Sequence, residues 1–307
     1  MPTLKFSKIA FALLVCAAVA IGTHTALGFF AEEKLYPVEN VPTLELPIIF
    51  ASEPPQAANR FIPDLPKTTT VQRPLSDVKN LAAKFDARNL KIELLASEPI
   101  VGATEVESCK SLVESTLAAL PADLTSSLEE MKLIFAKRNP RGLANSRLIE
   151  LRCGEISDDE VVAVLVHELG HIVDLGKLKG DSLAPSEFVD GKIPVPANDP
   201  SVTFYQLSWR NESEKNYLAD RKDFVSGYAM TDPFEDFSES FNFYVLHGAD
   251  FRAVKNESSI LTAKYDFLKN KVFAGIEFES KRATKPGKRV WDATLVEFDR
   301  AEFFARG

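Results

Sequence analysis

Two histidines four residues apart, His167 and His171, are the residues of this sequence most suited to chemistry. With Glu168 they form the pattern H-E-x-x-H inside an apolar stretch, Val161 to Gly176. Residues four apart lie on the same face of a helix, so the two imidazoles would point toward one metal ion. Glu168 would lie beside that ion as a base for a water molecule. The stretch therefore predicts a buried helix that binds one Zn²⁺ ion and serves hydrolysis.

The alternative interpretation of this pair is two hydrogen-bonded histidines of the core. Such histidines occur, and the spacing alone proves little. The chain, however, has only four histidines in 307 residues, and both members of the pair fall on an apolar helical stretch together with a glutamate. This combination favours the metal site.

A catalytic zinc ion needs a third protein ligand and an open fourth position. A further histidine close behind His171 is excluded, because Asp174 and Lys177 stand at the offsets where a glycine and a histidine would be needed. His247 is the only other histidine after the N-terminal segment. It precedes a glycine at the expected end of a helix, where a histidine suits the helix dipole, so we expect no metal there.

The preferred third ligand is Glu235, in the segment Asp232 to Gly248. Asp232 can cap a helix that begins at a proline and carries phenylalanines at helical spacing, and Glu235 and Glu239 lie four apart on one face of it. Glu239 could accept a hydrogen bond from a ligand histidine and fix its tautomer. From spacing alone, two other interpretations stay open: Glu235 could be a capping-box glutamate, and either acid could be solvated.

These residues together resemble a known family. The HELGH motif followed by Y-A-x-x-x-P-x-E-D-F-x-E-x-F is similar to the zinc peptidase domain of anthrax toxin lethal factor and its relatives, which are gluzincins. The resemblance covers about Thr104 to Phe278. It implies a zincin-like α+β domain with a small mixed sheet, an active-site helix and a second helix with E-x-x-x-E. It also implies that Glu235 is the third ligand and that Tyr228 assists the transition state; otherwise Tyr228 would be an ordinary half-buried aromatic residue.

The N-terminal part of the chain differs from the rest. Residues 1–28 combine two lysines, an apolar run and a small-x-small site, the layout of a secretory signal peptide, with an uncleaved membrane anchor as the alternative. Residues 29–78 are rich in proline and predict an extended arm or linker. The metallopeptidase domain is expected to span residues 79–307. In an exported protein, Cys109 and Cys153 would form a disulfide bond, with two free buried thiols as the alternative.

The domain is expected to place the two metal helices among further helices and strands. Apolar residues at helical spacing predict a helix at about 104–120, and further helices are expected at 122–130 and 261–273. The charged stretch 211–222 is expected to form an exposed helix. Strands are predicted at 131–137, 147–153 and 202–209, and the alternation in 147–153 favours an edge strand that could pair with an extended substrate. Asp158 or Asp159 would cap the first metal helix. The irregular stretch from Gly176 to Ser201 would form a rim or lid.

The sequence thus predicts an exported zinc endopeptidase that acts on a protein or peptide substrate. With a net charge of −8, the chain is not expected to bind nucleic acid or, beyond an N-terminal anchor, a membrane. We expect a monomer. A protein of another class, a non-catalytic exported binding protein with a structural zinc site, is the alternative.

Overall fold

The computed structural model describes residues 36–37, 90–96, 102–136, 140–280 and 290–306, all within one compact unit, Leu35–Gly307. The predicted signal segment, the proline-rich arm apart from residues 36–37, and the expected start of the domain lie outside the described residues. Within the described ranges, no helix is long and apolar enough to cross a membrane. The described part has an α+β fold with a small mixed sheet and several helices, as predicted.

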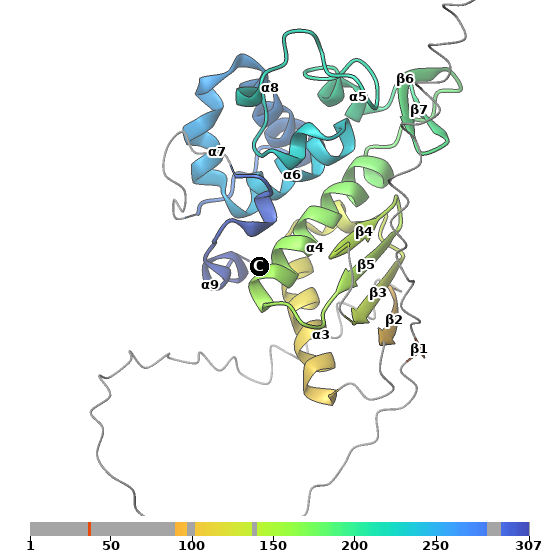
Figure 1. The fold of residues 1–307 in the computed structure, drawn as a ribbon, viewed down its shortest axis with the longest axis vertical. Helices are drawn as coiled ribbons and strands as arrows, with labels where there is room; N and C mark the ends of the chain where they lie inside the picture. The colour runs from red at the N-terminus through yellow and green to blue at the C-terminus, as the bar shows by residue number, and fades with distance from the viewer. Residues whose placement is uncertain (1–35, 38–89, 97–101, 137–139, 281–289, 307) are drawn as a thin grey trace, which may run out of the picture. The chain divides into compact units, whose positions relative to one another are not determined.

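A five-stranded sheet has the strand order β1-β2-β3-β5-β4 (Figure 1). The central strands β2, β3 and β5 run parallel to one another, and both outer strands are antiparallel to their neighbours. The inward side chains of β3 and β5 are fully buried, as their alternating apolar residues require. The strands are β1 (Tyr36–Pro37), β2 (Lys91–Ala96), β3 (Glu130–Phe135), β4 (Gly142–Ala144) and β5 (Leu148–Arg152).

The prediction that 147–153 is an edge strand is wrong. β5 pairs with β3 on one side and with β4 on the other, so its backbone groups are engaged along both edges. Alternation along a strand reports which face is buried, whereas an edge is defined by pairing, and the three residues of β4 are too few to show a pattern. The edge strand on this side of the sheet is therefore β4.

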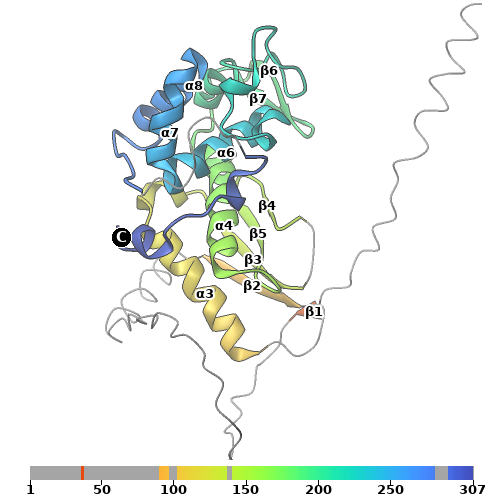
Figure 2. The same cartoon turned by 60° about the vertical axis from the view of Figure 1, so that its left-hand side comes forward.

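Helix α4 (Asp158–Ile172) carries the H-E-x-x-H motif and lies between the sheet and α6 (Pro233–Leu246) (Figures 1 and 2). Ser157, rather than Asp158 or Asp159, caps it: the Ser157 hydroxyl accepts a hydrogen bond from the Glu160 backbone N–H. Helix α3 (Ala103–Ala118) packs on α4. The predicted disulfide bond is confirmed, and it joins Cys109 of α3 to Cys153, directly after β5.

Three helices pack on α6 and form an aromatic core with it: α5 (Pro200–Tyr205), α7 (Gly248–Val254) and α8 (Ser259–Phe267). The last helix, α9 (Arg300–Phe304), packs on α3. Helix α8 continues as a π-helical turn, Leu268–Val272, close to the predicted helix 261–273. Inside this core the Lys264 ammonium of α8 contacts both carboxylate oxygens of Asp236 of α6, at 2.7 and 2.9 Å. Both side chains are fully buried, so this ion pair fastens α8 to the helix that bears Glu235.

Two elements differ in type from their predictions. Residues 200–205 form helix α5 instead of a strand, because Asp199 accepts the Ser201 N–H and a proline occupies the first helical position. The predicted helix 211–222 is absent: the Asn211 side chain accepts the N–H groups of Ser213 and Glu214, which turns the chain, and only a short 3₁₀ turn, Arg221–Asp223, follows.

Two other stretches are partly as predicted. The segment expected to be an irregular rim holds a hairpin of β6 (Pro185–Asp190) and β7 (Ile193–Pro196). The predicted helix 122–130 is only a 3₁₀ turn, Ala122–Thr125, because β3 already begins at Glu130. His247 ends α6 as predicted, and burial lowers its pKa to about 4.

Candidate metal centre

The three predicted metal ligands come from the two central helices. His167 and His171 project from one face of α4, and their ring centroids lie 5.2 Å apart. Gly170 lies where α4 crosses α6, and a Cβ atom there would come within 2.8 Å of the Ser238 backbone. The glycine of the HELGH motif thus allows the close helix crossing that brings Glu235 to the histidines.

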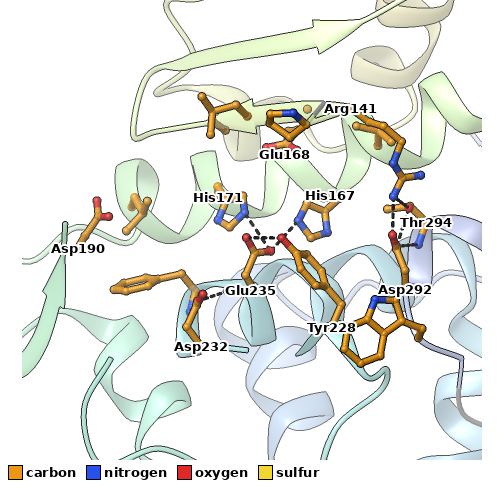
Figure 3. A pocket seen from close by; sticks show the side chains of 18 residues that line it. Arg141, His167, Glu168, His171, Asp190, Tyr228, Asp232, Glu235, Asp292 and Thr294 are labelled. Atoms are coloured by element: carbon orange, nitrogen blue, oxygen red, sulfur yellow. Dashed lines mark hydrogen bonds and ion pairs between the residues drawn. The ribbon is translucent and has the colours of Figure 1, made fainter. Parts of the chain in front are cut away.

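Glu235 reaches the two histidines from the first turn of α6. Asp232 caps this helix by accepting the N–H groups of Phe234 and Glu235, which leaves the Glu235 side chain free to turn inward. Its Oε2 atom is 3.0 Å from Nε2 of His167 and 3.6 Å from Nε2 of His171 (Figure 3). One ligand atom from each of the three residues lies within 4.8 Å of the others. Neither the capping-box interpretation nor the solvated one fits this position.

Glu239 lies one turn further along α6 and is fully buried. Its Oε1 is 3.0 Å from Nδ1 of His167, and its Oε2 accepts hydrogen bonds from the Ser226 hydroxyl and from the Ala293 backbone N–H. Because a carboxylate only accepts, Nδ1 of His167 is the donor, and Nε2 is the nitrogen directed at Glu235. Glu239 therefore fixes the orientation of the imidazole, as expected from its spacing.

The charges of this cluster are strongly coupled. Burial lowers the pKa of His167, but hydrogen bonds to Glu235 and Glu239 outweigh it and raise that pKa well above its usual value. Burial also opposes the charged form of Glu235, yet its hydrogen bonds with His167 and His171 lower its pKa strongly. Glu235 and Glu239 thus favour a positive charge at the imidazole of His167, whose Nε2 atom a divalent cation would contact.

Glu168 and Tyr228 lie on opposite sides of this cluster. Glu168 is buried beside the cleft, and burial raises its pKa while His167 and His171 lower it. The Tyr228 hydroxyl, from a 3₁₀ turn just before α6, donates to Oε1 of Glu235 over 3.1 Å. Burial and the neighbouring Glu235 carboxylate raise the pKa of Tyr228, so its hydroxyl keeps its proton at neutral pH.

A cleft of about 550 Å³ opens onto these side chains. Edge strand β4 borders it on one side and α4 on another. At one end Arg141 contacts Glu160 at 3.1 Å, the Thr294 hydroxyl at 2.9 Å and the Asp292 carboxylate (Figure 3). At the other end lies Asp190, from the β6–β7 hairpin, so the predicted rim does reach the cleft.

The C-terminal segment, residues 290–306, contributes to the centre in a way that the sequence did not indicate. Its Ala293 N–H holds Glu239, its Trp291 carbonyl accepts the Tyr228 N–H at 2.6 Å, and Trp291, Asp292 and Thr294 line the cleft. The segment lies more than 50 residues after Glu239, and its side chains form no recognisable motif. A capping aspartate before a polar turn, Asp292 with Thr294, was the only local signal.

The arrangement can hold one cation through three side chains, with a carboxylic base and a protonated phenol beside it and an open cleft in front. That set of groups suits a hydrolytic reaction assisted by a metal ion. No protein-family model, curated protein or solved structure matches this chain.

Proposed function

We propose that this chain is an exported zinc endopeptidase with a zincin-like catalytic domain. The observation that carries the proposal is the convergence of His167, His171 and Glu235 at the floor of an open cleft, with Glu168 beside them. Two imidazoles and one carboxylate, with an accessible side, are the donor set of many catalytic zinc sites. Among the described residues, this is the group of such donors that could hold a metal ion.

The donor set fits zinc better than calcium or magnesium. Imidazole nitrogens suit zinc, whereas calcium and magnesium prefer oxygen ligands throughout. Glu239 supplies the carboxylate behind a ligand histidine that often accompanies such sites. When bound, a zinc ion would polarise the carbonyl group of the substrate and lower the pKa of a water molecule in the open position to about 7.

Three side chains would carry the remaining chemistry. Glu168, buried beside the cleft next to His167, would accept the proton of the attacking water and deliver it to the leaving amine. Tyr228, whose hydroxyl stays protonated, would donate a hydrogen bond to the oxyanion that develops at the carbonyl. Glu239 would keep the Nδ1 proton of His167 in place, so that Nε2 presents its lone pair.

Edge strand β4 supports an extended peptide as the substrate. Arg141 and Leu143 direct their backbone groups toward β5, so Gly142 and Ala144 direct theirs to the edge with which no described strand pairs. Those residues also line the cleft. A peptide could therefore add to the sheet at β4 with its backbone beside the metal centre. The sequence predicted that strand 147–153 could pair with an extended substrate, and β4 would form that pairing instead.

A structural zinc site in a binding protein is the less favoured function. Structural sites are usually closed by four protein ligands, whereas three donors converge here and the fourth side faces a cleft. Export is supported by the disulfide bond between Cys109 and Cys153, since such bonds persist in oxidising compartments.

The test measures zinc content and hydrolysis of an unfolded protein substrate for the wild type and Glu168→Gln. We expect about one zinc ion per chain in both proteins, and a loss of hydrolysis of at least ~100-fold in the variant. Glu187→Gln, on the exposed face of β6, is the matched control and should behave as the wild type. A Glu168→Gln protein with normal zinc content and undiminished hydrolysis would refute the mechanism. Folded protein that binds no zinc would refute the metal site.

A further inference from the structure

Trp291 occupies an unusual position in the cleft. It is one of only two tryptophans in the chain, and 66% of its surface is exposed although it lines the cleft beside the metal centre. The other, Trp209, is buried and donates its indole N–H to Asp236. A large apolar side chain left exposed inside a cleft is typical of a surface that binds a ligand.

The backbone around Trp291 is fixed. The Tyr228 N–H donates to the Trp291 carbonyl at 2.6 Å, the Gly227 N–H donates to the Val290 carbonyl at 2.9 Å, and the Ala293 N–H donates to Glu239. The backbone on both sides of Trp291 is therefore hydrogen-bonded to the turn that carries Tyr228 and to Glu239. A ligand would meet a tryptophan whose backbone is set before binding, which lowers part of the entropic cost of binding.

Gly227 lets the indole lie directly on the backbone before Tyr228. A Cβ atom at position 227 would come within 2.4 Å of Cε3 of the indole and within 3.0 Å of Cζ3. The part of the indole around Cε3 and Cζ3 thus lies against the Gly227 backbone, while most of the residue's surface stays exposed at the cleft that Trp291 lines. An aromatic ring exposed in this way favours flat apolar groups, because stacked and edge-to-face contacts add to the burial of apolar area.

We propose that Trp291 forms a substrate subsite that selects an aromatic or other flat apolar side chain on the C-terminal side of the cleaved bond. This inference rests on the proposed peptidase function. Trp291 is adjacent to Asp292, which contacts Arg141 just before β4 begins. A peptide paired antiparallel to β4, the more stable orientation per residue, would place its later residues at this end of the strand.

Cleavage profiling with a peptide library tests the subsite. The wild type is expected to favour aromatic residues at one position after the cleaved bond. Trp291→Ala should reduce that preference by about tenfold while other positions keep theirs, and Trp291→Phe should retain most of it. Tyr217→Ala is the matched control, because Tyr217 is exposed but does not line the cleft. Equal zinc content and equal Tm in all four proteins would show that folding is unchanged.

The outcomes separate the subsite from the function on which it rests. If the wild type cleaves peptides and Trp291→Ala has the same profile at every position, the subsite is refuted and the peptidase function stands. If the wild type cleaves nothing, both are refuted. As a second readout, the best peptide from the profile should shift the tryptophan emission of Glu168→Gln to shorter wavelength, and Trp291→Phe in that background should abolish the shift. An unchanged shift in the double variant would contradict the subsite.

Discussion

Gly142 of edge strand β4 faces the proposed catalytic base, and replacing it by alanine tests the geometry of the centre. A Cβ atom at this position would lie 2.2 Å from Oε1 and 2.7 Å from Cδ of Glu168, and 2.7 Å from Cγ1 of Val164. Ordinary contacts of this kind begin near 3.4 Å, so the Glu168 carboxylate would have to move by about 1 Å. Because Glu168 is the end of a flexible side chain, it is the group that would give way.

The expected effect of Gly142→Ala is therefore larger on activity than on stability. A displacement of about 1 Å at a reacting group costs on the order of 100-fold in kcat. Accommodating the methyl group against Val164 should cost about 1 to 3 kcal/mol of the free energy of unfolding. Zinc content should stay at the wild-type level, since the atoms nearest to the added methyl belong to Glu168 and Val164 and not to the three proposed ligands.

The assay compares kcat, KM and zinc content of Gly142→Ala with those of the wild type, together with chemical denaturation. Gly102→Ala is the matched control, because a Cβ atom there would meet nothing within 4 Å and the residue has a φ of −63° that alanine adopts freely. If Gly142→Ala is folded, contains zinc and keeps the wild-type kcat, Glu168 does not need its present position. That result would contradict the proposal that Glu168 is the catalytic base.

Two predictions concern the fold that supports the centre. Burial raises the pKa of Asp174 from 3.8 to about 7, so this group ionises at lower pH in the unfolded chain than in the folded one. The free energy of unfolding should therefore fall by about 3 kcal/mol as pH rises from 4 to 7. Asp174→Asn should flatten this slope in denaturation curves, and an equally steep slope would contradict it. Lys264→Met should lower the free energy of unfolding by about 3 to 5 kcal/mol, because it leaves the Asp236 carboxylate buried without its cation. Adding Asp236→Leu should recover part of that loss. A double variant less stable than Lys264→Met would argue against this explanation.

The parts of the centre that could be predicted from sequence are those whose geometry a single helix determines. His167 and His171 share a face of α4 because they are four residues apart, and Glu235 and Glu239 share a face of α6 for the same reason. The cap at Asp232 was predictable because an aspartate before a proline fixes a helix start through local hydrogen bonds. Bringing the two helices together needed the resemblance, since nothing local states which helices cross.

Helix α5 begins with the same local signature as α6. Asp199 and Pro200 repeat the pair at Asp232 and Pro233, and both aspartates cap the helix that follows. The apolar residues after Pro200 instead suggested a strand, because a short apolar run does not distinguish a strand from a buried helix. The capping pair was the stronger signal, since it specifies backbone hydrogen bonds rather than burial alone.

Edge strand β4 shows where the limit of sequence reasoning lies. The period of side chains along a strand is set by burial of its faces, so it identified β5 but could not say that β5 has neighbours on both sides. Pairing is decided by chain segments outside the strand, and three residues with a glycine at the start carry almost no strand propensity. Yet a glycine is needed at position 142, because a Cβ atom there would collide with the side chain of Glu168 on helix α4. The residue that made β4 hard to recognise is thus the one that brings the free edge of the sheet against the proposed catalytic base.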